Sequence, residues 1–113
     1  MRKVLLVDDR NPVLTDTTKR LLTNRGHEVF GCHTWNYDET PKRNDVERVL
    51  YIALDIESGP VMLERICDDY PTAKVVIFST RPFLEKYEKQ IRDAEAQMLQ
   101  MPKRYYEIAA SLE

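Results

Sequence analysis

The sequence predicts an α/β fold in which five parallel strands alternate along the chain with helices. Short apolar runs rich in Val, Leu and Ile occur at Lys3–Val7, Val49–Leu54 and Lys74–Phe78. Runs of this kind, nearly unbroken by polar residues, are typical of strands that are buried on both faces of a parallel sheet. Segments with the apolar spacing of a helix separate them, which indicates βαβ units.

Length and composition indicate one globular domain that spans residues 1–113. Hydrophobic residues make up 42% of the chain and charged residues 32%, which is ordinary for a globular protein. The formal net charge of −2 provides no general attraction to nucleic acid or to an anionic membrane, so we expect no direct contact with either. No apolar run approaches the ~20 residues of a membrane span, and Asp8 and Asp9 end the first run too early for a signal peptide. We therefore expect a cytoplasmic domain whose two cysteines are free thiols.

A first helix is expected between Pro12 and Gly26. Asn11 can cap its first turn, proline suits the first helical position, and glycine is a common C-terminal stop. One face of this helix is apolar: Leu14, Leu21 and Leu22. The segment that follows, His27 to His33, is predicted to be the second strand.

The middle of the chain contains the third strand and the segments on either side of it. The polar stretch from Trp35 to Asp45 has room for no more than a short helix. The third strand is Val49 to Leu54, and Gly59-Pro60 opens a longer helix that ends before Pro71. The inner face of that helix is predicted to be Met62, Leu63, Ile66 and Cys67.

The C-terminal part contains two more strands and two more helices. Lys74–Phe78 is the fourth strand, and Pro82 begins a long helix that continues through Glu95. The apolar side of this helix is Phe83, Tyr87, Ile91 and Ala94. Gln97–Gln100 is a short fifth strand, and Lys103–Ala110 is a final helix. Five parallel strands with helices on both faces form a doubly wound sheet of the flavodoxin-like kind.

Three aspartates follow predicted strands at positions where they can meet. Asp8 and Asp9 close the first strand, and Asp55 closes the third. If these strands are neighbours, the three carboxylates share the carboxyl edge of the sheet, where open α/β folds place their sites. Such a cluster repels itself unless a hard cation neutralises it, and Mg2+ is the usual solution for a few carboxylates plus water. The alternative for Asp8 and Asp9 is that they stabilise the start of the first helix, which explains one acid but not two in succession.

The order and content of these segments resemble the receiver domains of two-component response regulators. The resemblance covers nearly the whole chain, and its most specific part is the opening Lys3–Asp9, followed after a helix by Arg25–Val29. It continues through Gly59–Pro71 and the strand Val75–Ser79, and then through Met101-Pro102 ahead of the last helix.

The resemblance implies a phosphoryl-accepting site at the carboxyl edge. In that family an acidic pair binds Mg2+, and an aspartate that ends the third strand accepts a phosphoryl group from a histidine kinase or a phosphotransfer protein. Here Asp55 takes the position of the phosphoacceptor. The expected Mg2+ ligands are Asp8, Asp9, Asp55 and the backbone carbonyl of Glu57.

The resemblance also implies a residue that senses the phosphoryl group. A hydroxyl side chain at the end of the fourth strand has this role, which points to Ser79, with Thr80 as the alternative. Both hydroxyls can equally act as caps of the helix that Pro82 begins. Charged residues flank the helix-4 to helix-5 face that receivers use for pairing, so a homodimer through that face is expected: Arg81, Arg92, Lys103 and Arg104.

Three departures from the family's pattern concern the phosphoryl site. The family has a lysine at the end of the fifth strand, followed by a cis proline, and this chain has Met101 in that position. The ammonium group that would pair with an aspartyl phosphate is therefore missing, and charge-assisted contacts are roughly twice as strong as neutral ones. The loop from Asp55 to Gly59 is shorter than is usual in the family and lacks its Met-Pro pair, and Met98 stands where the family often has an aromatic residue.

Two functions remain open from the sequence. The first is a phosphorelay receiver that switches a protein-interaction face, with no enzymatic activity beyond its own phosphorylation and dephosphorylation, to which an effector domain can be attached after residue 113. The second is a pseudo-receiver that binds proteins without phosphorylation. A small Mg2+-dependent phosphohydrolase is a distant third because no general acid is evident. The potential metal-binding side chains His27, Cys32, His33 and Cys67 lack the spacing of a metal site, so we expect structural or surface roles for them.

Overall fold

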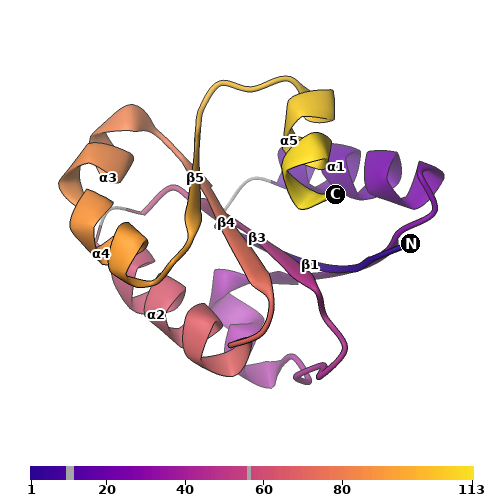
Figure 1. Ribbon diagram of the computed structural model, residues 1–113, viewed down its shortest axis with the longest axis horizontal. Helices are drawn as coiled ribbons and strands as arrows, with labels where there is room; N and C mark the ends of the chain where they lie inside the picture. The colour runs from indigo at the N-terminus through magenta and orange to yellow at the C-terminus, as the bar shows by residue number, and fades with distance from the viewer. Residues whose placement is uncertain (10–11, 56) are drawn as a thin grey trace.

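The computed structural model describes residues 1–9, 12–55 and 57–113 and confirms the predicted fold. The strands form one parallel sheet in the order β2-β1-β3-β4-β5 (Figure 1). These strands are β1 (Lys3–Asp8), β2 (Glu28–His33), β3 (Arg48–Ala53), β4 (Lys74–Ser79) and β5 (Gln97–Gln100). The helices are α1 (Pro12–Asn24), the 3-10 helix η1 (Thr34–Glu39), α2 (Gly59–Asp69), α3 (Arg81–Lys86), α4 (Glu88–Asp93) and α5 (Tyr105–Leu112).

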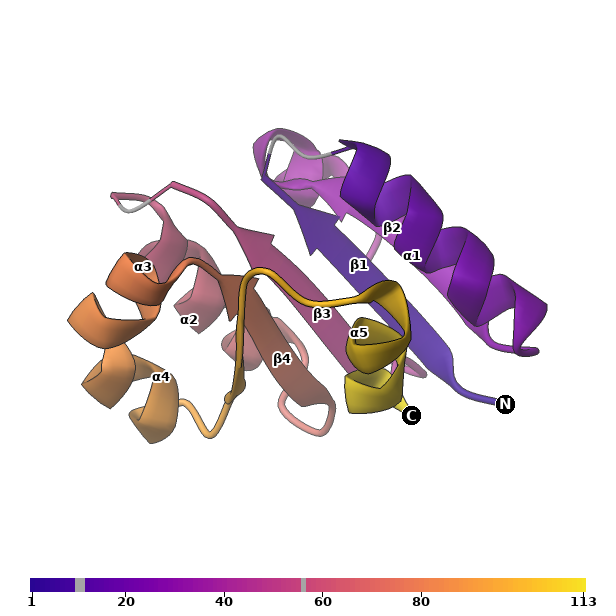
Figure 2. The same cartoon turned by 90° about the horizontal axis from the view of Figure 1, so that it is seen from above.

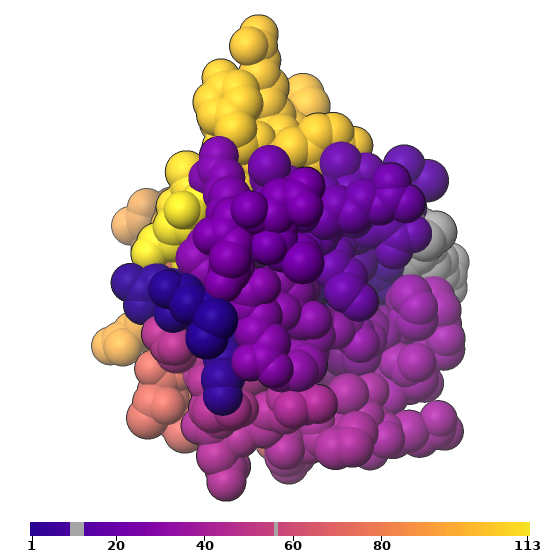
Figure 3. All heavy atoms as spheres, turned by 90° about the vertical axis from the view of Figure 1, so that its right-hand side faces the viewer, coloured from indigo at the N-terminus to yellow at the C-terminus, as the bar shows by residue number. Residues whose placement is uncertain are grey.

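Helices cover both faces of the sheet. Helices α1 and α5 lie side by side on one face, and α2 with η1 lies on the other (Figures 1 and 2). Helices α3 and α4 pack on the same side as α2, next to β5. The surface at the β2 end of the molecule is formed mainly by the N-terminal part of the chain, with the start of α5 projecting above it in yellow (Figure 3).

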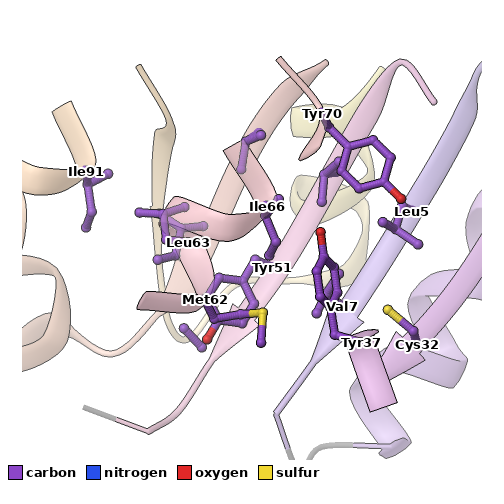
Figure 4. Close-up of a cluster of buried hydrophobic side chains, with 14 of the residues drawn as sticks. Leu5, Val7, Cys32, Tyr37, Tyr51, Met62, Leu63, Ile66, Tyr70 and Ile91 are labelled. Atoms are coloured by element: carbon purple, nitrogen blue, oxygen red, sulfur yellow. The ribbon is translucent and has the colours of Figure 1, made fainter. Parts of the chain in front are cut away.

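The two-layered covering explains the composition of the strands. Successive strand residues point to opposite faces, so a strand between two helical layers must be apolar throughout. In β1, Val4 and Leu6 pack in the core under α1 and α5, whereas Leu5 and Val7 pack in the core under α2. Figure 4 shows this second core, with Ile66 of α2 lying against the sheet.

Helices α2 and α3 approach each other closely at Gly59. A Cβ atom at this position would lie 2.4 Å from Cε2 of Phe83. Because the ring of Phe83 is buried in a close-packed core, a side chain at position 59 would force this ring to shift, which explains the glycine at the start of α2. The second glycine with a conformational role is Gly26, whose φ of +88° ends α1 as the sequence predicted.

The predicted long helix from Pro82 to Glu95 is wrong in one respect, because it is broken at Tyr87. The backbone torsions of Tyr87 are φ −112° and ψ 19°, which separates α3 from α4. Helical hydrogen bonds continue across the break: the Tyr87 N–H donates to the Phe83 carbonyl at 3.1 Å, and the Ile91 N–H donates to the Tyr87 carbonyl at 3.0 Å. The apolar spacing is therefore preserved, which is why the sequence pattern did not reveal the break.

The peptide bond before Pro102 and the state of the two cysteines were also predicted from the sequence. The Met101–Pro102 peptide bond is cis, as the resemblance implied. Both cysteines are free, and Cys67 is only partly buried, so it does not belong to the fully buried face of α2. The predicted cap Asn11 lies outside the described residues. Within the described ranges, none of the helices is long and apolar enough to cross a membrane.

Candidate functional site

The sheet brings the predicted site residues to its carboxyl edge. Asp8 is the last residue of β1 and is paired in register with Ile52 of β3 on one side and with His33 of β2 on the other. Ser79 ends β4 and is paired with Ala53, two residues before Asp55. The neighbouring strands that the sequence argument assumed are therefore present.

Asp8 is completely buried and already has partners for its carboxylate. The Thr15 hydroxyl of α1 donates a hydrogen bond to Oδ2 at 2.7 Å. On the other side, Nδ1 of His33 contacts Oδ1 directly. The imidazole of His33 is stacked on the ring of Trp35, with centroids 4.2 Å apart and planes 7° from parallel. Asp8 thus joins β1, β2 and α1 through side-chain contacts.

Asp9 connects the end of β1 to the loop after β3. Its carboxylate is nearly buried and accepts a hydrogen bond from the backbone N–H of Asp55 at 2.8 Å and from the Thr34 hydroxyl at 3.4 Å. Its own N–H donates to the Ile52 carbonyl at 3.1 Å. These contacts hold Asp9 next to the backbone of the predicted phosphoacceptor.

The carboxylate of Asp55, which is the least buried of the three acids, holds the turn that leads into α2. It accepts hydrogen bonds from the Glu57 N–H and the Ser58 hydroxyl, each at 2.9 Å. The backbone carbonyl of Asp55 accepts the Gly59 N–H at 3.0 Å. In this short loop the carboxylate stabilises the approach to a helix N-terminus, where backbone N–H groups favour an acid.

The expectation that the acids repel one another without a cation stays a prediction, but the structure shows donors around each of them. Each of the three carboxylates accepts hydrogen bonds from hydroxyl, amide or imidazole groups, as described above. In the part of the chain that the structure describes, no group of three or more His, Cys, Asp or Glu side chains is arranged to hold a metal ion. The residues as they stand do not present an open ligand set for Mg2+, because His33 contacts one oxygen of Asp8 and the Thr15 hydroxyl donates to the other. The assignment of Mg2+ to Asp8, Asp9, Asp55 and the Glu57 carbonyl stays a prediction.

The hydroxyl of Ser79, which was predicted to sense the phosphoryl group, makes a hydrogen bond within the sheet. Ser79 is fully buried, and its hydroxyl donates to the backbone carbonyl of Ala53 on the neighbouring strand. Thr80 is exposed and takes the N-cap position of α3, but its side chain makes no capping hydrogen bond. Only its backbone contributes, since the Leu84 N–H donates to the Thr80 carbonyl at 3.1 Å.

Met101, which the resemblance places at the lysine position, packs against the core. Its side chain is partly buried and packs on the apolar cluster under α1 and α5. Its N–H donates to the carbonyl of Ser79 at 2.8 Å, which places it beside the end of β4. Lys103 lies in an exposed segment beyond Pro102. The position that carries an ammonium group in the family is therefore apolar here.

Tyr51 lies beneath the acidic edge and was not identified from the sequence. Its hydroxyl is buried and has no hydrogen-bond partner among the described residues. Burial raises the pKa of Tyr51, and the negative charges of Asp9 and Asp55 raise it further, so the side chain stays neutral. Figure 4 shows the ring beside Met62 of α2.

The sequence argument also missed the partners of the acids, of which His33 is the clearest case. A surface or structural role was expected for it, and its contact with Asp8 is a structural role whose partner the sequence did not reveal. The available signal was its position as the last residue of the predicted second strand, which becomes informative only once β2 is known to pair with β1 in the register Asp8 to His33. Of the two thiols, that of Cys32 is the more deeply buried, and burial raises its pKa to about 11.

No protein-family model and no curated protein sequence matches this chain. Several solved structures are similar to it. A response regulator receiver domain protein from Methanospirillum hungatei is 21% identical with a TM-score of 0.79, and the match covers 98% of this chain and 90% of that one. A signal receiver domain of an HD domain-containing protein from Pseudomonas fluorescens is 23% identical with a TM-score of 0.76, covering 99% of this chain and 92% of that one.

A third similar structure comes from a response regulator of Burkholderia pseudomallei. It is 26% identical with a TM-score of 0.68, and the match covers 98% of this chain and 66% of that one. That structure contains a phosphorylated aspartic acid, a calcium ion and citrate. Together, these similarities show that the chain has the fold of response regulator receiver domains.

Proposed function

We propose that this chain, which has the receiver-domain fold, is a signalling module that binds a partner protein without phosphorylation of Asp55. The observation that carries the proposal is Met101, whose side chain packs in the core where the family has a lysine. A phosphoryl group on Asp55 would bring a charge of about −1.5 to −2 at neutral pH. Met101 supplies no ammonium group to pair with this charge, so the phosphorylated state gains little stability over the unmodified one.

Ser79 supports the same conclusion. A hydroxyl that senses a phosphoryl group has to turn toward it, and the Ser79 hydroxyl is buried and donates to Ala53. Turning it away would leave the Ala53 carbonyl without this donor at a buried position, which costs free energy. The carboxylate of Asp55 likewise already accepts hydrogen bonds from Glu57 and Ser58 in the turn before α2.

A second candidate is the ordinary phosphorelay receiver, in which Asp55 accepts a phosphoryl group from a histidine kinase or a phosphotransfer protein. What favours it is that Asp55 is only partly buried and that its backbone N–H donates to Asp9. This candidate requires Mg2+, and therefore requires that Asp8 lose its contact with His33. For this second candidate we propose no enzymatic activity beyond self-phosphorylation and self-dephosphorylation, and for the first candidate none.

The partner-binding surface that we propose lies on the helix-4 to helix-5 face that the resemblance implies, in the part formed here by α3, α4 and β5. A groove of about 310 Å3 lies there, and it is lined by Leu84, Glu85, Glu88, Met98 and Gln100. Ion pairs hold its rim, with Arg81 paired to Glu85 and Arg92 paired to Glu88. This face is the proposed site of pairing with a second copy or with another protein.

Met101→Lys tests the proposal by restoring the missing charge. We expect calorimetric titration with Mg2+ and beryllofluoride, a mimic of the aspartyl phosphate, to show no binding or weak binding to the wild type. If the rest of the site is competent, Met101→Lys should bind the mimic roughly 10- to 100-fold more tightly, the value of one added charge-assisted contact.

Lys103→Met is the matched control, because it removes an ammonium group that lies two residues after Met101 in the same loop. It should leave the titration of the wild type unchanged. Wild-type binding as tight as that of Met101→Lys would contradict the proposal and support the phosphorelay receiver, whereas absence of binding by both proteins would support the phosphorylation-independent module.

A further inference from the structure

The contact between His33 and Asp8 is the feature of the acidic edge that the function above does not use. We propose that His33 takes the place of a cation in this pocket, and that it is the residue that determines that Asp8 binds no metal ion. The inference concerns the same pocket as the proposed function and deepens it, but it is tested by a different measurement.

The backbone places His33 for this contact. β2 is the neighbour of β1, and the register pairs His33 with Asp8, the last residue of each strand. Residues opposite each other on neighbouring strands point to the same face of the sheet. The imidazole therefore reaches Asp8 without any distortion of the chain.

Three contacts hold the imidazole in one orientation. The backbone N–H of His33 donates to Oδ1 of Asn36 at 2.8 Å, which fixes the turn into η1. The ring of Trp35 covers one face of the imidazole. Nδ1 faces Oδ1 of Asp8, and because a carboxylate can only accept, Nδ1 carries the hydrogen and donates it.

This arrangement satisfies Asp8 with a partner from the protein on each of its oxygens. The carboxylate is fully buried, and its two oxygens are used by His33 and Thr15. Mg2+ requires oxygen ligands at ~2.0–2.1 Å in near-octahedral geometry, so it would have to displace the imidazole from Oδ1. Asp9 has partners from the protein as well, since its Oδ2 accepts the N–H of Asp55 at 2.8 Å and its Oδ1 accepts the Thr34 hydroxyl at 3.4 Å. A fixed donor thus stabilises the buried acid in place of an exchangeable ion.

His33→Ala tests the inference through its response to Mg2+. In EDTA we expect its melting temperature to fall by roughly 5–15 °C relative to the wild type, because a buried acceptor loses its donor. Saturating Mg2+ should recover a large part of this loss, because an ion that binds only the folded protein stabilises it. The melting temperature of the wild type should be the same in EDTA and in Mg2+.

Two further variants separate the donor from the rest of the side chain. His33→Asn carries an amide N–H at the position of Nδ1, so it should restore most of the stability and remain insensitive to Mg2+. The double variant His33→Ala with Asp8→Asn removes the negative charge that would attract Mg2+. Its melting temperature should therefore be the same in EDTA and in Mg2+. His33→Thr, which suits a strand end but cannot reach Asp8, replaces His33→Ala if the alanine variant does not fold.

Trp35 supplies an independent signal. It is the single tryptophan of the chain, it stacks on His33, and its side chain is 64% exposed. A metal ion that displaced the imidazole would change the Trp35 emission. Titration of the wild type with Mg2+, and separately with Zn2+, which prefers imidazole ligands, should leave the emission unchanged.

Several results would overturn the inference. A rise in the wild-type melting temperature with Mg2+ equal to that of His33→Ala would show that His33 does not exclude the ion. The absence of any Mg2+ response in His33→Ala and His33→Thr would show that another feature does so. Binding of Zn2+ by the wild type with a change in Trp35 emission would show that His33 is a metal ligand. Phosphorylation of a wild type that does not respond to Mg2+ would instead contradict only the proposed function.

Discussion

Replacing Asp8 with alanine is expected to lower the melting temperature by roughly 8–20 °C, which corresponds to a loss of about 2–3 kcal/mol in the free energy of unfolding. The carboxylate of Asp8 is fully buried and accepts hydrogen bonds from Thr15 and His33. Its removal takes away the acceptor of the Thr15 hydrogen bond and the side-chain contact between β1 and β2 at the carboxyl edge. Thermal unfolding followed by circular dichroism, in EDTA, measures the effect.

Two variants make this measurement specific. Asp8→Asn keeps the shape and one acceptor oxygen, so it should lose less stability than Asp8→Ala. Asp16→Ala, on the exposed side of α1, should change the free energy of unfolding by no more than about 0.5 kcal/mol. A higher melting temperature for Asp8→Ala or Asp8→Asn would show that the acids repel one another and that their hydrogen bonds do not compensate.

Replacing Ile66 with alanine is expected to cost about 2–5 kcal/mol, the range for deleting a large aliphatic side chain from a well-packed core. Ile66 is fully buried between α2 and the sheet (Figure 4). Urea unfolding should show a lower midpoint with an unchanged slope. The effect is large because the core under α2 includes residues of β1, β3 and β4, which the cavity would loosen together.

Val61→Ala is the matched control on the same helix. Val61 is 62% exposed, so its truncation should change the free energy of unfolding by no more than about 0.5 kcal/mol. Equal losses for the two variants would contradict the orientation of α2 that the apolar spacing predicted and the structure shows.

The strands could be predicted because two helical layers require apolar residues on both of their faces. β5 matches its predicted range from Gln97 to Gln100, and β4 extends its predicted range by one residue, to Ser79. The end of α1 was also readable, because Gly26 adopts a positive φ that favours glycine. The strand ranges and the end of α1 depend on residues that are close in the sequence, so the pattern of residue types is enough to predict them.

The contacts that define the site depend on strand pairing and could not be predicted in the same way. The aspartates were found because each follows an apolar run, but their partners come from β2, η1 and α1. His33 is 25 positions from Asp8, and only the register between β1 and β2 brings the two together. The break at Tyr87 was missed for a different reason, since it alters a backbone torsion and leaves the apolar spacing unchanged.

The most direct test of the central claim is the intact mass of the wild-type protein after incubation with acetyl phosphate and Mg2+. With Met101 in place of a lysine and Ser79 bonded to Ala53, we predict that the mass does not change. Asp55→Asn, treated identically, supplies the reference for phosphorylation at any other position. A gain of one phosphoryl group by the wild type that Asp55→Asn lacks would contradict the account and identify Asp55 as a working phosphoacceptor.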